Sequence, residues 1–258
     1  GAFEIEVIRK FIAKPEKNQL KIRDILASTR TISCEFFPPK TAERISDVFG
    51  AVDRLKDFCL DFASVTYGAG GTTQAFTEEI TVGLKARNGM EVVAHLTCAG
   101  QTQAEIDQVL QRLDRANIEN VIALRGDPPR GESAFVPVEG GFQHASDLIQ
   151  HIRENFRFSM AAACYPEGHS ESVDLDTDLK YTKLKVVQGA EFLITQLFYD
   201  NNDFFDFVDR ARKAEVDVPI IPGTLPILST PQIRRFTALC GAKLPPHLDQ
   251  QLERFADD

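Results

Sequence analysis

Short apolar stretches rich in β-branched residues recur at even intervals along the chain. They predict strands at 31–38, 62–68, 92–98, 120–126, 158–166, 192–199 and 218–227. Most of these stretches lack alternation of polar and apolar residues, so we expect both faces of each strand to be buried. Strands of this kind are typical of a parallel sheet covered by helices.

Amphipathic stretches with a helical period lie between the predicted strands. In residues 42–57, the apolar positions Ile45, Val48, Val52 and Leu55 fall on one stripe. Further helices are predicted at 73–88, 102–116, 143–156, 175–188, 202–214, 231–240 and 247–256, and residues 3–29 are expected to form one or two helices. This βαβα order, without an internal boundary, predicts a single α/β domain.

The predicted fold is a TIM (β/α)8 barrel that lacks its last unit. A chain of 258 residues suits such a barrel, whose typical length is about 250 residues. Seven strands are readable, so we expect the last βα unit to be missing from this chain; an open doubly wound sheet is the alternative. Residues 1–30 are then an N-terminal helical extension, and residues 31–258 form the barrel domain.

Composition and charge narrow the classes of partner. Hydrophobic residues make up 43% of the chain and charged residues 26%, as in ordinary globular proteins. No apolar run approaches the roughly 20 residues of a membrane span. The net charge of −9 does not favour nucleic-acid binding. The five cysteines are widely spaced and no signal peptide is visible, so we expect a cytoplasmic protein without a disulfide framework. No histidine or cysteine has metal-ligand spacing, and no metal site is expected.

Polar side chains gather at the carboxyl ends of the predicted strands, where parallel α/β folds place their functional groups. Glu35 lies in an apolar strand beside Phe36 and Phe37. Desolvation there should raise the pKa of its carboxyl group and suit it to general-acid catalysis, whereas a structural pair with a buried arginine is the alternative. His95, in the third strand, is either a core residue or a functional one.

Four more strand ends carry groups that suit a ligand. The glycine-rich segment 66–73 lets the backbone approach a ligand, or forms a tight loop. Residues 125–127 (RGD) offer an arginine for phosphate and an aspartate for a hydrogen bond, or form a capped turn. Residues 165–169 add an aromatic ring and a histidine. Gln196, within the sixth strand, can bind a heterocycle edge or serve as a core amide. The set suits a planar, polar ligand with phosphates and leaves the reaction open.

Together, these strand-end motifs resemble those of the methylenetetrahydrofolate reductase family. The matching segments are Ser33–Thr41 (SCEFFPPKT), Ser64–Thr73 (SVTYGAGGTT), Ala94–Cys98 (AHLTC), Ile122–Pro129 (IALRGDPP), Gly140–Leu148 (GGFQHASDL), Tyr165–His169 (YPEGH), Lys183–Ala190 (KLKVVQGA), Thr195–Asp200 (TQLFYD) and Ile221–Pro226 (IPGTLP). One such motif is weak, but nine in order over residues 31 to about 240 are very specific.

The resemblance implies a (β/α)8 barrel that holds FAD at the carboxyl ends of its strands. In this family, NADH or NADPH reduces the flavin and leaves; 5,10-methylenetetrahydrofolate then takes its place and is reduced to 5-methyltetrahydrofolate. A ping-pong oxidoreductase of one-carbon and methionine metabolism is therefore implied, with a homo-oligomeric state that is usual in the family. The chain has no dinucleotide-binding fingerprint, so the sequence does not choose between NADH and NADPH.

The resemblance also implies roles for single residues. Glu35 matches the general acid that helps to open the methylene bridge, and Asp127 matches the aspartate beside the flavin and the pterin. The implied substrate-binding residues are Gln196, Gln232 and Phe236. The positions implied to surround FAD are Thr66, Tyr67, Ala69, His95, Arg125, Gly126, Asp127, Ala145, Tyr165, His169, Asp178 and Lys185. Among these, Arg125 and Lys185 are expected to face the pyrophosphate.

Two other functions are compatible with such a barrel. A flavin-free, pterin-binding methyltransferase-type barrel would lack the flavin matches at 125–127 and 165–169, and bound flavin would discriminate. A non-catalytic homologue acting as a binding subunit is opposed by the retention of Glu35, Asp127 and Gln196. The regulatory domain of eukaryotic family members is not in this chain, so control by S-adenosylmethionine is not expected.

Overall fold

The computed structural model describes residues 21–67, 71–128 and 134–254, apart from the side chains of 71–73. The N-terminal extension is therefore tested only at its end, where α2 spans Ile22–Ser28. Its backbone N–H at Ile22 donates to Oδ1 of the buried Asn120 at 2.8 Å. None of the helices in the described ranges is both long and apolar enough to cross a membrane.

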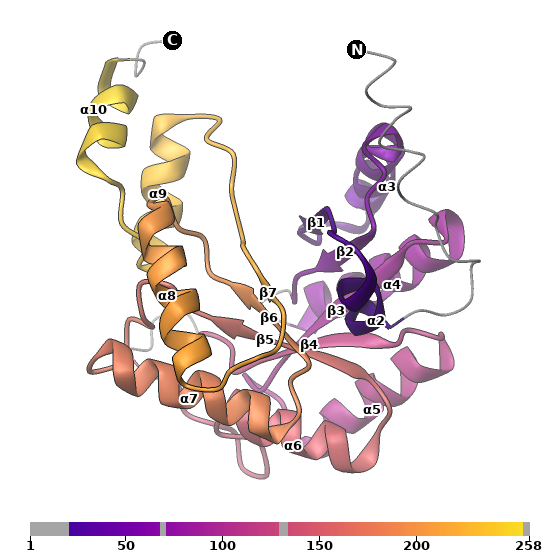
Figure 1. Cartoon of the computed structure of the whole chain (residues 1–258). Helices are drawn as coiled ribbons and strands as arrows, with labels where there is room; N and C mark the ends of the chain where they lie inside the picture. Colours follow the sequence, from indigo (N-terminus) through magenta and orange to yellow (C-terminus); the bar gives the residue numbers. More distant parts are fainter. Residues whose placement is uncertain (1–20, 68–70, 129–133, 255–258) are drawn as a thin grey trace. The chain divides into compact units, whose positions relative to one another are not determined.

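The described residues contain seven strands, each overlapping a predicted stretch (Figure 1). Their order in the sheet follows the chain, from β1 to β7, and the recorded pairs are parallel. The strands are β1 (Ser33–Phe36), β2 (Phe62–Val65), β3 (Glu91–Thr97), β4 (Asn120–Leu124), β5 (Ser159–Cys164), β6 (Phe192–Thr195) and β7 (Ile220–Ile221). The predicted seven-stranded α/β fold of the TIM type is confirmed.

Helices alternate with the strands as predicted. They are α3 (Ile45–Arg54), α4 (Gly71–Asn88), α5 (Gln103–Arg115), α6 (Ala145–Asn155), α7 (Leu175–Gln188), α8 (Asn201–Lys213), α9 (Thr230–Cys240) and α10 (Pro246–Arg254). The helix predicted at 42–57 is divided, because 3-10 turns at Ala42–Arg44 and Lys56–Phe58 flank α3. Cys59 then turns the chain with a left-handed φ of 52°.

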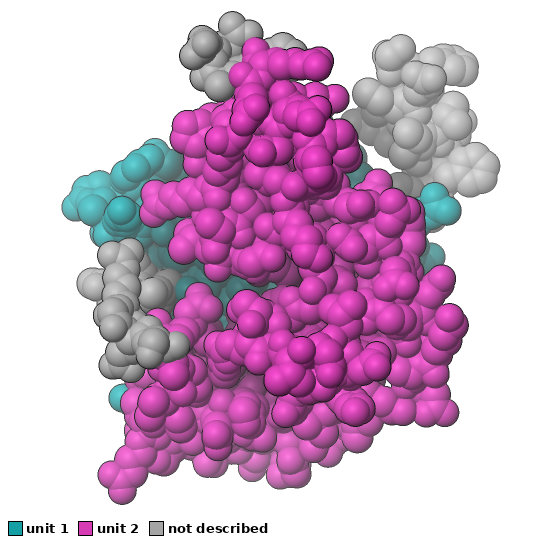
Figure 2. All heavy atoms as spheres, turned by 90° about the vertical axis from the view of Figure 1, so that its left-hand side faces the viewer, with its two compact units in different colours: residues 1–96, 104–121, 157–159 teal, residues 97–103, 122–156, 160–258 magenta. Residues whose placement is uncertain are grey.

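The chain divides into two compact units, which Figure 2 shows in different colours. Unit 1 comprises Gly1–Leu96, Ala104–Val121 and Arg157–Ser159. Its core joins the helical stripe predicted for α3 to the apolar residues of β2, β3 and α4. The buried members of this cluster are Ile45, Val52, Ala63, Val65, Ile80, Leu84 and Val92.

Unit 2 comprises Thr97–Gln103, Ile122–Phe156 and Met160–Asp258. Strands β5, β6 and β7 pair in parallel, with Ala161 opposite Phe192 and Leu193 opposite Ile220. Strand β7 has only two residues, although 218–227 predicted a longer strand. Three prolines in that stretch lack the N–H that a sheet ladder needs, which limits the strand to Ile220 and Ile221.

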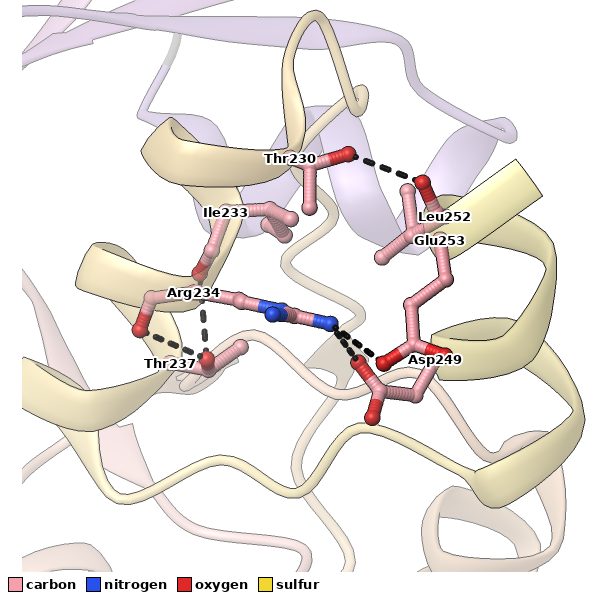
Figure 3. A network of polar contacts seen from close by, with 7 residues as sticks. All are labelled: Thr230, Ile233, Arg234, Thr237, Asp249, Leu252 and Glu253. Atoms are coloured by element: carbon pink, nitrogen blue, oxygen red, sulfur yellow. Dashed lines mark hydrogen bonds and ion pairs between the residues drawn. The ribbon is translucent and has the colours of Figure 1, made fainter. Parts of the chain in front are cut away.

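Helices α9 and α10 of unit 2 are joined by a polar network (Figure 3). The Arg234 guanidinium contacts Asp249 Oδ1 at 2.9 Å and Glu253 Oε1 at 3.4 Å. The Thr230 hydroxyl donates to the carbonyl of Leu252 at 3.2 Å. Because Asp249 and Glu253 are one turn apart on α10, Arg234 also offsets the repulsion between their carboxylates.

We expect Arg234→Ala to loosen α10 without changing the rest of the chain. Partly exposed ion pairs contribute about 0.2–1 kcal/mol each, and Arg234 makes two of them, so amide hydrogen exchange over 246–254 should become roughly twofold to thirtyfold faster. Mass spectrometry of exchanged peptides measures this change. Arg235→Ala, at the exposed neighbouring position, is the control; equal acceleration in both variants would show that loss of charge alone is responsible.

Candidate active site

Three polar side chains of unit 1 meet on one face of its strands. The Ser64 hydroxyl of β2 donates to Glu35 Oε2 of β1 at 3.3 Å, and His95 Nε2 of β3 lies 3.4 Å from the same oxygen. Glu35 pairs with Ser64 in the parallel register, and Ser64 pairs with Val93, two residues before His95. Side chains alternate along a strand, so this register puts the three groups on the same face.

The Glu35 carboxyl group lacks the raised pKa that its apolar neighbours predicted. Partial burial does raise the pKa of Glu35, but the contact and charge of His95 and the hydrogen bond from Ser64 outweigh it, so the pKa is lowered. The prediction of a raised pKa is therefore wrong. A buried arginine partner is not found among the described residues either; the ionisable partner of Glu35 is His95.

His95 also lines a cavity of about 710 Å³ within unit 1. Tyr67, another predicted flavin position, lines the same cavity together with Thr77, Glu78 and Arg112. Thr66 is held beside it, because the Thr77 hydroxyl donates to the Thr66 carbonyl at 2.8 Å. The volume lies within the range of about 300–1,000 Å³ that is common for cofactor and ligand sites. Ala69, the remaining predicted residue of this loop, lies outside the described residues.

The predicted phosphate partner Arg125 already has a partner in unit 2. Its guanidinium binds the Glu171 carboxylate through two nitrogens, at 2.5 and 2.7 Å. This bidentate pair lowers the pKa of Glu171. Gly126 follows with φ of +87°, a left-handed conformation that favours glycine. Asp127 comes next and is exposed.

The other flavin positions of unit 2 form a second cluster after β5. The rings of Tyr165 and His169 meet edge to face, with centroids 4.7 Å apart. The His169 backbone N–H donates to the buried Asp178 of α7 at 3.3 Å. The Lys185 amine, also on α7, donates to the Ala163 carbonyl at 2.6 Å and lies 5.7 Å from the centre of the Tyr165 ring. Four of the positions that the family resemblance implies for FAD thus lie close together in unit 2.

Burial shifts the acid–base groups of this cluster. It raises the pKa of Tyr165 to about 12, and nearby Asp178 and Asp127 add to the shift. It lowers the pKa values of His169 and Lys185. His169 Nδ1 accepts a hydrogen bond from the Glu171 N–H at 3.1 Å, so the neutral ring carries its proton on Nε2. Tyr165 is thus a neutral hydrogen-bonding group at pH 7.

The predicted substrate residues lie on two elements of unit 2. The sequence predicted Gln196 within the sixth strand, but β6 ends at Thr195 and Gln196 follows it directly. The side-chain oxygen of Gln196 accepts a hydrogen bond from the Leu197 N–H at 2.9 Å. Gln232 and Phe236 both lie on α9, one turn apart. Ala145, assigned to the flavin, is the first residue of α6.

Two site residues were missed by sequence reasoning. Ser64 opens one of the matching segments, and its register opposite Glu35 could have revealed it had the strands been aligned. Glu171 follows the segment Tyr165–His169 by two residues, and no local pattern marks it as a partner of Arg125. Both were missed because a pairing between strands or loops leaves no periodic signal.

Two solved structures share the fold of this chain. A Clostridium thermocellum protein, titled as an uncharacterized protein that binds two copies of 5-methyl-5,6,7,8-tetrahydrofolic acid, aligns with a TM-score of 0.61 at 18% identity, covering 90% of this chain and 79% of that one. A 3-dehydroquinate dehydratase from Geobacillus kaustophilus aligns with a TM-score of 0.53 at 14% identity, covering 81% and 79%. These likenesses support the α/β fold alone.

Sequence similarity then identifies the family. The sequence model described as methylenetetrahydrofolate reductase matches residues 21–258, and the chain belongs to this family. "Methylenetetrahydrofolate reductase (NADH) 1" of Arabidopsis thaliana is 38% identical over 250 residues, which cover 92% of this chain and 42% of that protein. "5,10-methylenetetrahydrofolate reductase" of Escherichia coli is 36% identical over 227 residues, with coverage of 88% and 75%. The chain thus spans less than half the length of its plant relatives.

Gly126→Ala tests the tight turn between Arg125 and Asp127. A Cβ at position 126 would lie 2.7 Å from Cβ of Ala99, which cannot rotate away. Gly140→Ala is the matched control, since its φ is +73° but nothing lies within 4 Å of the added Cβ. We expect a loss of about 1–2 kcal/mol in unfolding free energy for Gly140→Ala from backbone strain alone, and roughly 1–3 kcal/mol more for Gly126→Ala from overlap. Urea denaturation measures both; equal losses would show that the loop moves to relieve the overlap.

Proposed function

We propose that this chain is the catalytic part of an FAD-dependent methylenetetrahydrofolate reductase. NADH or NADPH reduces the flavin and leaves, and 5,10-methylenetetrahydrofolate is then reduced to 5-methyltetrahydrofolate in a ping-pong sequence. The observation that carries the proposal is the Glu35 carboxylate, held beside Ser64 and His95 in a chain that belongs to this family. We further propose one catalytic domain over residues 31–258, a cytoplasmic location and a homo-oligomeric state.

Each unit, taken by itself, carries groups of the kind that bind parts of a flavin. His95 is buried and lines the cavity of unit 1, where its ring can meet a ligand. Arg125 supplies a bidentate cation for a pyrophosphate, and Tyr165 a flat, neutral ring. When bound, FAD accepts hydride from the nicotinamide and delivers it to the folate.

The protein groups then act on the substrate. Glu35 donates its proton to a nitrogen of the methylene bridge, so that the carbon becomes an iminium that accepts hydride. Asp127 is exposed and places a negative charge at the end of β4. The Gln196 amide presents its NH2 group to a pterin or nicotinamide edge, since its oxygen is engaged by the Leu197 N–H.

Spectroscopy of the two half-reactions tests this function. We expect the purified protein with FAD to show a flavin spectrum that bleaches under anaerobic NADH or NADPH and recovers when methylenetetrahydrofolate is added. In Glu35→Gln, bleaching should persist and recovery should slow by about 10²–10⁴-fold, the usual contribution of a general acid. Glu43→Gln, on the exposed turn before α3, is the control.

Each half of the result excludes an alternative. A protein that binds no flavin would contradict the reductase and favour a flavin-free pterin-binding barrel. A flavin that bleaches but never returns its hydride to the folate in the unaltered chain would favour a non-catalytic homologue. Unchanged recovery in Glu35→Gln would overturn the role of Glu35.

The pair between Arg125 and Glu171 predicts how FAD affinity responds to charge. A pyrophosphate has to share or displace the Glu171 carboxylate, which is 52% exposed. Glu171→Gln should therefore tighten FAD binding by about 1.5-fold to 5-fold, the range of a partly exposed ion pair. Recovery of FAD fluorescence on release measures the affinity, with the exposed Asp217→Asn as the control. Weaker binding would show that Glu171 orients Arg125 and does not compete for it.

A further inference from the structure

The contacts of Glu35 converge on one of its two carboxylate oxygens. Both the Ser64 hydroxyl and His95 Nε2 approach Oε2, at 3.3 and 3.4 Å. No hydrogen bond or ion pair within the described residues ends on Oε1. The two oxygens are therefore in different surroundings, although they are chemically equivalent in a free carboxylate.

Burial divides the cluster in the same way. Ser64 and His95 retain only 6% and 8% of their surface, whereas 43% of the Glu35 side chain is exposed. The two partners thus anchor the carboxylate from the buried side of the strands. The free oxygen is left for the exposed side, where a substrate can reach it.

The strand register fixes this arrangement. Ser64 is the direct neighbour of Glu35 in the parallel pair. Rotation about a single bond, Cα–Cβ, sets the position of its hydroxyl oxygen. A serine rotamer has few alternatives at a buried position, so the donor stays beside Oε2.

We propose that Ser64 is a positioning residue for Glu35: it holds Oε2 together with His95, so that Oε1 carries the proton that is given to the substrate. This inference rests on the proposed function, because it assigns an atom to the acid step of that reaction. Ser64 touches neither the folate nor the flavin in this assignment and acts through Glu35.

The acid step transfers one proton from Glu35 to the substrate. The Oε1–H bond of Glu35 breaks, and the proton passes to the bridge nitrogen whose bond to the methylene carbon opens. That nitrogen keeps the electron pair of the broken bond, and the carbon becomes the iminium. The negative charge left on Glu35 is stabilised by the Ser64 hydroxyl and by His95, so both partners make the carboxyl group a stronger acid.

The groups that face Glu35 come from two neighbouring strands. Strand β2 contributes the uncharged Ser64, and β3 contributes the titratable His95. No other charged group of the described residues acts on the Glu35 carboxyl. Without the Ser64 hydroxyl, only His95 would still lower the pKa of Glu35, while burial would continue to raise it. The pKa of Glu35 should therefore rise in such a variant.

Direct titration of Glu35 tests the inference independently of turnover. The carboxyl ¹³C signals of the glutamate-labelled protein are followed against pH, and the signal of Glu35 is assigned as the one absent in Glu35→Gln. Ser64→Ala should raise the measured pKa of Glu35 by about 0.5–1 unit. Ser64→Thr, which keeps a hydroxyl group, should restore the original value.

Ser159→Ala is the matched control. Ser159 is a fully buried strand serine of unit 1, and its hydroxyl has no hydrogen-bond partner among the described residues. This variant should leave the Glu35 titration unchanged. An equal shift in both alanine variants, or none in Ser64→Ala, would overturn the inference whether or not the protein reduces folate.

The pH dependence of the folate half-reaction completes the test. Glu35 must be protonated to act, so the rate falls as pH rises through its pKa. In Ser64→Ala this fall should move to higher pH by the same 0.5–1 unit, while flavin reduction by the nicotinamide keeps its profile. A shifted titration in a protein that never reduces folate would overturn the proposed function and, with it, the positioning role. A shifted titration with an unmoved folate profile would overturn the role of Ser64 alone.

Discussion

The parallel register between β1, β2 and β3 is the constraint on which the candidate site depends. Because Glu35 pairs with Ser64 and Ser64 with Val93, three polar groups share one face of otherwise apolar strands. A shift of one residue would send Ser64 to the opposite face and leave Glu35 without its hydroxyl partner. The apolar side chains that pack α3 and α4 against these strands hold that register. The position of the three polar groups therefore depends on the packing of the core.

Two opposed effects set the pKa of Glu35. Removal of water raises the pKa of the carboxyl group, and contact with two polar partners lowers it. The partners prevail, because an exposed fraction of 43% leaves the carboxylate partly hydrated while both contacts fall on it at short range. The acid strength of a strand carboxyl group beside phenylalanines is therefore decided by its neighbours on the adjacent strands.

The sequence predicted the strands and helices well, since apolar periodicity reports burial directly. It failed where a tertiary partner or a local exception decided the outcome. Prolines shortened β7, and Gln196 lies just beyond β6, where its side-chain oxygen accepts from the next backbone N–H at Leu197. The residues of the family motifs were found, but the bond from Arg125 to Glu171 and the role of Ser64 depend on which strand or loop lies alongside, and spacing along the chain does not encode that.

The carboxylate of Glu171 gives the cation of Arg125 a tethered competitor. A group attached through the fold acts at a high effective concentration, independent of how dilute the protein is. A small anion that meets Arg125 alone has to exceed that effective concentration to displace it. When a large ligand is bound at other points as well, its anionic group is held near Arg125 at a comparable effective concentration. That group can then displace the Glu171 carboxylate from Arg125. If Arg125 binds an anion as proposed, the pair favours ligands that the protein also holds at other points.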